Sequence, residues 1–430
     1  MVFNAPKNFA LFKQRRKRLL EKIKEMHLGA SKGVIIIGAG FEADRHVFRQ
    51  ENSFYYLTGI TEPAVILCMY FDGSEVLYIP RFGTARDQWV NVAIKGPEDA
   101  AAVGVDSIRY LGSAFSGYSA NAVFMRDNYE TLVGDLASYL DRQTKVFSLL
   151  ERSYEGYAKS INFFEHLQTW LPVMASNGID VSPLVADLRC IKDEYEVDLI
   201  YKAVQITNMA HRAAASVIKD GRYEYEVQAA LEYVYTHVAA AQASFPSIVA
   251  TGKNTTVLHY TQRTQQLKTG DLVVVDIGAE YGQYAADLTR TYPVGGAFSD
   301  RQREVYQLVL ETQAHIESIA VPGMYLKNPQ MPEKSLHHRA VQFLETRGYA
   351  QYFCHGIGHY LGLDVHDVGS YNTPLEPGMV FTIEPGIYIA AENLGVRIED
   401  DYIMADDGAV CLSYDLPKDP DAVEQLMRAE

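Results

Sequence analysis

The sequence predicts an α+β protein with a smaller mixed α/β domain in residues 1–175 and a larger domain in residues 180–430. Three observations support this prediction. The chain of 430 residues is longer than a typical single domain. Small and turn-forming residues gather at 176–183, a pattern that favours a domain boundary. After this point, two helical patterns followed by strand patterns occur twice in the same order.

The first 170 or so residues mix strand patterns with helical patterns. Apolar runs at 34–37, 64–71 and 76–79 are typical of strands, and residues 126–141 and 161–170 are typical of helices. The basic run Lys13–Arg18 also lies in a helical pattern, and we interpret it as a solvated helix face.

The second domain consists of a repeated unit of two helices and a group of strands. The first copy is predicted as helices at 193–219 and 223–240 and strands at 247–250, 272–281 and 284–294. The second copy is predicted as helices at 299–320 and 333–347 and strands at 379–384, 386–390 and 396–404. Such a duplication predicts a curved antiparallel sheet that is covered by helices.

The composition excludes several classes of protein. Charged residues sum to a net charge of −15, which disfavours binding to nucleic acid. No apolar run approaches the roughly 18 residues of a membrane-spanning helix, and no secretory signal is visible, so we expect no membrane partner. The four cysteines are scattered and form no C-x-x-C motif, so neither a disulfide framework nor a thiolate zinc site is predicted. We expect a cytoplasmic protein.

Carboxylates interrupt the predicted strands of the second domain. Asp276 lies in an apolar strand, and Asp287 lies in the return strand after Gly282 and Gln283. If these two residues form a two-residue turn, Asp276 lies opposite Thr289, and both carboxylates share one face, about 7–8 Å apart at Cα. A three-residue turn would place them on opposite faces. Two carboxylates on one apolar face repel each other unless they share a proton or a cation.

More acids and histidines follow in the second copy. Glu384 ends a predicted strand, and Glu399 shares a strand face with Arg397. The glycine-rich segment between the two hairpins carries three histidines, His355, His359 and His366. Its glycines argue against a helical H-x-x-x-H zinc site and favour a loop or bent strand that comes close to a ligand. Four carboxylates and one imidazole form a hard ligand set that suits a pair of Mn²⁺, Co²⁺ or Zn²⁺ ions.

These segments resemble the pita-bread metallopeptidases, the family of aminopeptidase P, prolidase and methionine aminopeptidase. The motifs that carry the resemblance occur in the expected order: His259-Tyr, Val275-Asp-Ile-Gly, Tyr284-Ala-Ala-Asp-Leu-Thr-Arg, His355-Gly-Ile-Gly-His-Tyr-Leu-Gly-Leu-Asp-Val-His-Asp, Glu376-Pro-Gly-Met-Val-Phe-Thr-Ile-Glu-Pro-Gly and Val396-Arg-Ile-Glu-Asp-Asp. Residues 48–63 resemble the N-terminal domain of the proline-specific members. The resemblance implies a C-terminal pita-bread domain.

The resemblance also implies a metal-binding role for five residues. Asp276 would bind one metal, His359 and Glu384 would bind the other, and Asp287 and Glu399 would bridge both. Manganese is the expected metal, with cobalt or zinc as alternatives. Each chain would then hold two divalent ions.

Further roles follow from the same resemblance. A hydroxide that bridges the metals would attack the scissile carbonyl, and Glu384 would take the proton of the water. His259, His355 and His366 would line the site, and His366 would stabilise the oxyanion or shuttle a proton. Arg397 would hold a ligating carboxylate in place.

The function predicted in this way is that of a metallo-aminopeptidase that releases the N-terminal residue from peptides with proline in the second position. A prolidase, which cleaves only Xaa-Pro dipeptides, is the alternative. A non-catalytic peptide-binding relative is disfavoured because all five ligand positions are present. The resemblance further implies a homo-oligomer, either a dimer or a tetramer.

A nucleotide-binding function is a third possibility. Residues 38–43 read Gly-Ala-Gly-Phe-Glu-Ala after a strand and imitate the dinucleotide fingerprint. That site needs a helix to begin there and receive the pyrophosphate. The charged and aromatic residues 44–53 follow instead, so we favour an ordinary glycine turn.

Overall fold

The computed structural model describes residues 9–43, 47–82, 86–174, 178–239 and 241–428. The described chain forms two compact units, and the division between them lies between Leu188 and Arg189. The boundary predicted from the sequence begins at residues 175–177, which lie outside the described residues, and it stays a prediction. None of the described helices is long and apolar enough to cross a membrane.

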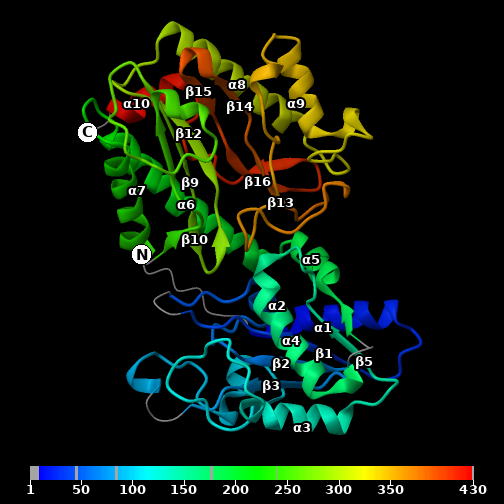
Figure 1. The fold of residues 1–430 in the computed structure, drawn as a ribbon. Coiled ribbons are helices and arrows are strands. Elements are labelled where there is room, and N and C mark those ends of the chain that lie inside the picture. The colour runs from blue at the N-terminus through cyan, green and yellow to red at the C-terminus, as the bar shows by residue number, and fades with distance from the viewer. Residues whose placement is uncertain (1–8, 44–46, 83–85, 175–177, 240, 429–430) are drawn as a thin grey trace. The chain divides into compact units, whose positions relative to one another are not determined.

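The first unit contains a six-stranded mixed sheet with the strand order β4-β3-β2-β1-β5-β6 (Figure 1). The strands are β1 (Gly33–Gly38), β2 (Ile66–Tyr70), β3 (Glu75–Ile79), β4 (Ser107–Tyr110), β5 (Lys145–Ser148) and β6 (Gly178–Asp180). The helices are α1 (Phe9–Met26), α2 (Asn52–Thr58), α3 (Glu130–Tyr139), α4 (Ala158–Trp170) and α5 (Ser182–Cys190), whose last two residues belong to the second unit. The predicted mixed α/β domain is confirmed.

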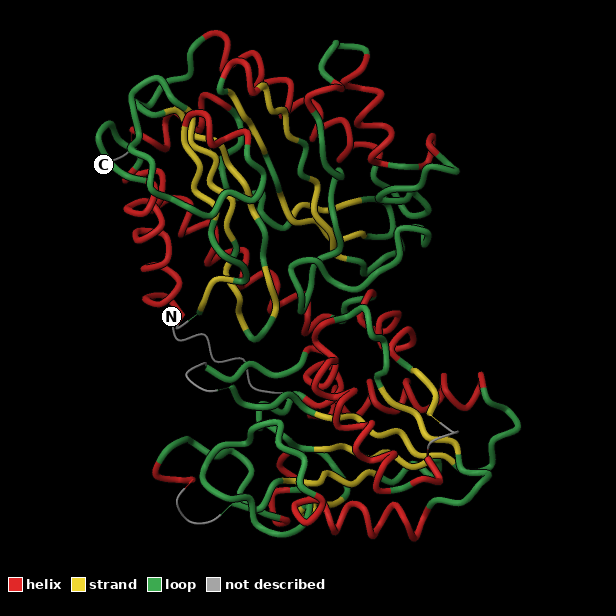
Figure 2. Tube along the Cα trace, viewed as in Figure 1, coloured by secondary structure: helices red, strands yellow, loops and turns green. Residues whose placement is uncertain are grey.

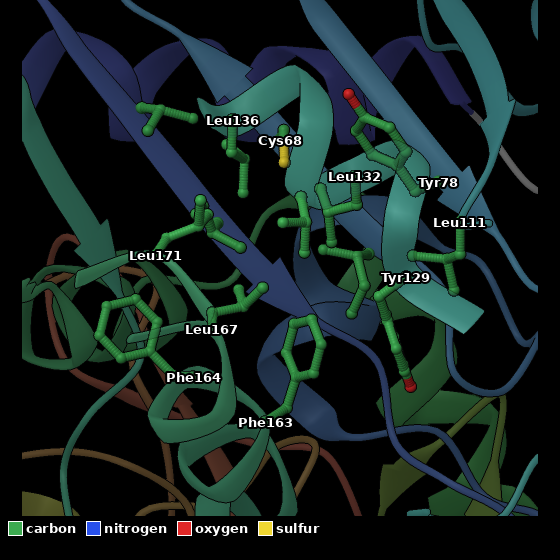
Figure 3. Close-up of a cluster of buried hydrophobic side chains, with 14 of the residues drawn as sticks. Cys68, Tyr78, Leu111, Tyr129, Leu132, Leu136, Phe163, Phe164, Leu167 and Leu171 are labelled. Atoms are coloured by element: carbon green, nitrogen blue, oxygen red, sulfur yellow. The ribbon is translucent and has the colours of Figure 1, made fainter. Parts of the chain in front are cut away.

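One face of this sheet is covered by α3 and α4 (Figure 3). Alternate residues of the strands, such as Ile66 and Cys68, meet Leu136 of α3 and Leu167 of α4 in one buried cluster. Burial of each large apolar side chain contributes about 1.5–3 kcal/mol. After β1, the described residues 39–43 and 47–51 are not helical, so the fingerprint-like glycines lack the helix that a pyrophosphate site requires.

Helix α1 corrects one interpretation of the sequence. Within the basic run Lys13–Arg18, Arg15 and Arg16 are each only 1% exposed. Arg16 donates to both carboxylate oxygens of Glu75, with distances of 2.9 Å from Nε and 2.8 Å from Nη2. Because a bidentate pair neutralises the guanidinium, arginine can occupy a position that charge alone assigns to solvent. The run is therefore only partly solvated.

The second unit repeats a pair of helices followed by strands. The first copy contains α6 (Glu194–Val217), α7 (Glu224–Ala239), β7 (Gln242–Ala243), β8 (Ile248–Thr251), β9 (Leu272–Ile277), β10 (Ala279–Tyr281), β11 (Tyr284–Ala285) and β12 (Leu288–Pro293). The second contains α8 (Asp300–Ile319), α9 (Leu336–Glu345), β13 (Val380–Ile383), β14 (Gly386–Ile389), β15 (Leu394–Arg397), β16 (Asp400–Met404), β17 (Ala409–Cys411) and α10 (Pro420–Arg428). Figure 2 shows the helices on the outside of these strands. The predicted duplication is present.

The hairpin that carries Asp276 has the register of the two-residue turn. Gly282 and Gln283 have φ angles of 58° and 68°, as a type I′ turn requires. Tyr281 therefore pairs with Tyr284, and Asp276 lies opposite Thr289. This register places Asp276 and Asp287 on one face of the sheet, as predicted.

The strands are less continuous than the sequence suggests. The predicted strands 272–281, 284–294 and 396–404 are interrupted between β9 and β10, between β11 and β12, and between β15 and β16. Two of these breaks contain Asp287 and Glu399. The Asp287 amide donates to the Asp401 carboxylate at 3.1 Å, and Glu399 exchanges backbone hydrogen bonds with Thr289. The second of these contacts joins the two copies, so that β9, β12 and β15 lie side by side (Figure 1).

The buried Arg16–Glu75 pair generates a stability prediction. Arg16→Met should lower the free energy of unfolding of the first unit by about 3–5 kcal/mol, because it leaves the Glu75 carboxylate buried without its partner. The matched control Arg18→Met removes an exposed arginine of the same helix and should cost less than about 0.5 kcal/mol. Guanidinium unfolding monitored by fluorescence measures both values, and equal losses would contradict the prediction.

Candidate active site

A cleft of about 440 Å³ in the second unit contains every site residue predicted from the sequence. The residues lie in or next to strands of both copies, on the β8–β9 connection and on the glycine-rich segment: His259, Asp276, Asp287, His355, His359, His366, Glu384, Arg397 and Glu399. The segment with the three histidines is a loop and not a helix, as its glycines predict. Close packing explains the glycine at position 358, because a Cβ there would lie 1.9 Å from the Thr382 carbonyl oxygen.

Three buried side chains lie close enough to hold one metal ion. Ligand atoms of Asp287, His359 and Glu399 all lie within 4.8 Å of one another. Nε2 of His359 is 3.4 Å from Oδ2 of Asp287, 3.7 Å from Oε1 of Glu384 and 3.8 Å from Oε1 of Glu399. One imidazole nitrogen therefore faces three carboxylates.

Backbone contacts orient the His359 ring. Its Nδ1 lies 3.0 Å from the Tyr360 carbonyl oxygen, so Nδ1 carries the proton and donates it to that oxygen. The lone pair on Nε2 then points towards the carboxylates and is available to a cation. The His359 amide also donates to the Thr382 hydroxyl at 3.2 Å, which holds the backbone at this position.

Arg397 is buried and contacts several groups around the carboxylates. Its Nη2 donates to Oδ2 of Asp276 at 2.6 Å, and its Nη1 donates to the Tyr388 hydroxyl at 2.9 Å. Its Nε donates to the Thr289 hydroxyl at 3.2 Å, and this hydroxyl donates to Oε2 of Glu399 at 2.7 Å. Arg397 thus holds Asp276 directly and Glu399 through Thr289.

The other histidines differ in their surroundings. His355 is held between the Gly356 carbonyl oxygen at 2.8 Å and the Tyr388 hydroxyl at 2.9 Å. Burial lowers the pKa of His355 to about 3 and the pKa of His366 to about 4, so both rings are neutral at pH 7. The His366 ring lies 4.2 Å from the His359 ring, whereas His259 is exposed at the edge of the cleft.

The electrostatics of the carboxylates fit a divalent metal. Burial, reinforced by Asp276, raises the pKa of Asp287 well above its usual value, and burial and Asp287 do the same for Glu399. Burial raises the pKa of Glu384 to about 7. Oδ1 of Asp276 and Oδ1 of Asp287 are buried and have no hydrogen-bond partner among the described residues, which is costly without a cation. Oxygen and imidazole ligands at these positions suit Mn²⁺, Co²⁺ or Zn²⁺.

Sequence reasoning missed three supporting residues. Thr289, which donates to Glu399, could have been found, because it lies opposite Asp276 in the predicted register. Thr382 and Asp401, which hold the backbones of His359 and Asp287, have no such signal. Their contacts depend on how the glycine-rich loop and β11 pack against β13 and β16.

Family comparisons match both parts of the chain. Residues 198–406 match metallopeptidase family M24, and residues 12–124 match the N-terminal domain of aminopeptidase P. The Xaa-Pro aminopeptidase of Haemophilus influenzae is 33% identical over 404 residues, which cover 88% of each chain. The Xaa-Pro dipeptidase of Pyrococcus furiosus is 39% identical over 233 residues, which cover 53% of this chain and 64% of the dipeptidase.

A solved structure extends the similarity to the fold. Zinc-substituted Escherichia coli aminopeptidase P in complex with product has a TM-score of 0.82 at 27% identity, covering 99% of this chain and 100% of that one. The predicted fold class is therefore confirmed over nearly the whole chain.

The raised pKa of Glu384 predicts how the metal-free protein responds to pH. The folded chain keeps this proton up to about pH 7, whereas the unfolded chain releases it near 4.5. Folding stability of metal-free protein should therefore fall as the pH rises from 5 to 7.5. Glu384→Gln removes the titrating group and should make this fall smaller.

Thermal unfolding after treatment with a chelator measures the effect. The exposed Glu311→Gln serves as the control and should leave the pH dependence of the wild type unchanged. If Glu384→Gln and the wild type lose stability equally over this interval, the prediction is wrong.

Proposed function

Because this chain belongs to metallopeptidase family M24, we propose that it is an Xaa-Pro aminopeptidase, which hydrolyses the bond between an N-terminal residue and a following proline. Its similarity to the Haemophilus influenzae enzyme supports this substrate class. The strongest support within the structure is the cleft in which four carboxylates and one imidazole converge.

Two divalent ions per chain fit the charges of this cleft, and we propose that they are manganese. Asp276, Asp287, Glu384 and Glu399 carry four negative charges when ionised, and Arg397 supplies one positive charge. One divalent ion would leave an excess of negative charge, whereas two would remove it. Asp276 would hold one ion, His359 and Glu384 the other, and Asp287 and Glu399 would contact both. When bound, such ions make water nucleophilic at neutral pH and polarise the scissile carbonyl.

The remaining steps are carried by side chains of the cleft. Glu384 lines the cleft beside His359 and is suited to accept a proton from water and pass it towards the proline nitrogen. His366 is neutral and can donate its N–H to the carbonyl oxygen as negative charge develops there. His355 is held by Tyr388, and His259 is an exposed residue of the cleft wall that a peptide could contact. Arg397 keeps Asp276 in place throughout.

The charge of the cleft favours peptides of three or more residues over Xaa-Pro dipeptides. A dipeptide places its carboxylate on the proline itself, close to the reacting bond, and this carboxylate needs a cationic partner. Among the described residues that line the cleft, Arg397 is the one lysine or arginine, and it is buried and paired with Asp276. A longer peptide has a neutral amide at this position. We therefore favour the aminopeptidase over the prolidase.

We also propose that the protein forms a dimer or tetramer and acts in the cytoplasm. Support for an oligomer comes from exposed apolar side chains of the first unit. Trp89 is 64% exposed and stacks on Tyr118 at 4.4 Å, and Val123 and Met125 are also exposed. The four cysteines are free, which suits a reducing compartment.

The substrate class is tested with a matched pair of peptides. The protein with added Mn²⁺ should cleave an Xaa-Pro-Yaa tripeptide at least about tenfold more efficiently than the Xaa-Pro dipeptide, because the dipeptide carboxylate lacks a partner. Chromatographic quantification of the released residue gives kcat/KM for both. Cleavage of the dipeptide alone would establish the prolidase alternative instead.

The proposed ligands are tested by metal removal and substitution. Stripped protein should lose its peptidase activity and regain it with Mn²⁺, Co²⁺ or Zn²⁺ added separately. Asp287→Ala and Glu399→Ala should each lower the metal content and reduce kcat by at least about a thousandfold, because both remove a buried ligand. The exposed Cys354→Ala should retain metal and activity. Robust cleavage by either acid variant would refute the bridging roles.

A further inference from the structure

Two residues of the cleft wall lie on a chain segment with little regular structure. Leu258 and His259 belong to the connection between β8 and β9, residues 252–271, whose only helical part in the described chain is a short turn at Gly252–Thr256. Such a connection needs other contacts to hold side chains against a peptide.

Those contacts converge on Glu224, the first residue of α7. Its side chain is fully buried and accepts four hydrogen bonds, the number that a carboxylate can accommodate. Oε1 accepts from the Thr251 amide at 2.8 Å and the Asn254 side-chain amide at 3.1 Å. Oε2 accepts from the Tyr260 hydroxyl at 2.9 Å and the Gln265 amide at 2.9 Å. One carboxylate thus bonds to the last residue of β8 and to three positions along the connection.

Tyr260 links this carboxylate to the cleft. Its ring packs in a small cluster with Ile248 and Ala250 of β8, and its hydroxyl reaches Glu224. Leu258 and His259 immediately precede it in the chain. With the Tyr260 ring packed and its hydroxyl bonded, the backbone just before it has a defined path past the cleft.

We propose that Glu224 is a positioning residue for peptide binding, which holds Leu258 and His259 on the cleft wall through Tyr260. Glu224 itself does not line the cleft, so its effect passes through the connection. This inference rests on the proposed function, because it assumes that Leu258 and His259 contact a bound peptide. Loss of the Glu224 carboxylate should therefore weaken peptide binding and affect the rate of the chemical step less.

The test is Glu224→Gln in the full-length, metal-loaded protein. The amide keeps the size of the side chain, but its NH₂ group cannot accept a hydrogen bond. It therefore faces N–H or O–H donors that the carboxylate oxygen accepted from. KM for an Xaa-Pro-Yaa peptide should rise about tenfold, whereas kcat should change less than about threefold and metal content should not change. Tyr260→Phe removes only the hydroxyl and should shift KM in the same direction. This second variant keeps the test decisive if Glu224→Gln fails to fold.

Glu226→Gln is the matched control. Glu226 also lies in the first turn of α7, but its carboxylate accepts from the Tyr223 amide at 2.8 Å and from Arg222 at 2.7 Å, and among the described residues it shares no hydrogen bond with 252–265. It should leave KM within about twofold of the wild type. Equal effects of the two glutamine substitutions on KM would refute the proposal.

A second background separates positioning from general stability. In a Leu258→Ala/His259→Ala protein, Glu224→Gln should raise KM much less than in the wild type, because the wall through which it acts is gone. An undiminished effect there would overturn the proposal.

Hydrogen exchange of residues 256–262 should be faster in Glu224→Gln and Tyr260→Phe and unchanged in Glu226→Gln, and unchanged exchange in all three would also overturn it. If the wild type cleaves no Xaa-Pro peptide, the proposed function fails, but the exchange result still decides whether Glu224 holds the connection.

Discussion

The central constraint on the second unit is the burial of four carboxylates around a single guanidinium. Asp276, Asp287, Glu384 and Glu399 come from both copies of the repeated unit, and Arg397 pairs directly only with Asp276. The pKa of Asp287 and of Glu399 is raised because burial and mutual repulsion oppose ionisation. The metal-free fold therefore carries an electrostatic cost that bound divalent cations would remove. Metal binding and stability are coupled through the same oxygen atoms.

The same constraint explains where the strands break. Asp287 and Glu399 lie between strands, and their backbones bond to Asp401 and Thr289 in place of a regular ladder. A continuous strand would turn alternate side chains to opposite faces at a constant spacing. Both carboxylates reach His359 from these breaks. The Thr289–Glu399 contact adds a link between the two copies at a residue that lines the cleft.

Local patterns predicted much of this arrangement from the sequence. The Gly282–Gln283 turn set the register that places Asp276 and Asp287 on one face, and the glycines near His359 indicated a loop. Contacts that depend on tertiary packing were not predictable in this way. The burial of Arg16 requires Glu75, which lies 59 residues further along the chain. Apolar periodicity alone therefore assigned that arginine to solvent.

Some side chains around the site contact two groups at once and so connect them. Thr289 accepts from Arg397 and donates to Glu399, so a neutral hydroxyl connects a cation to a carboxylate without adding charge. Glu224 lies outside the lining of the cleft, and four hydrogen bonds satisfy its carboxylate. The groups that hold the cleft carboxylates differ in charge: Arg397 is a cation, Thr289 is neutral, and Asp401, which accepts from the Asp287 amide, is itself a carboxylate. What these groups share is a directed hydrogen bond, so geometry and not charge alone fixes the carboxylates.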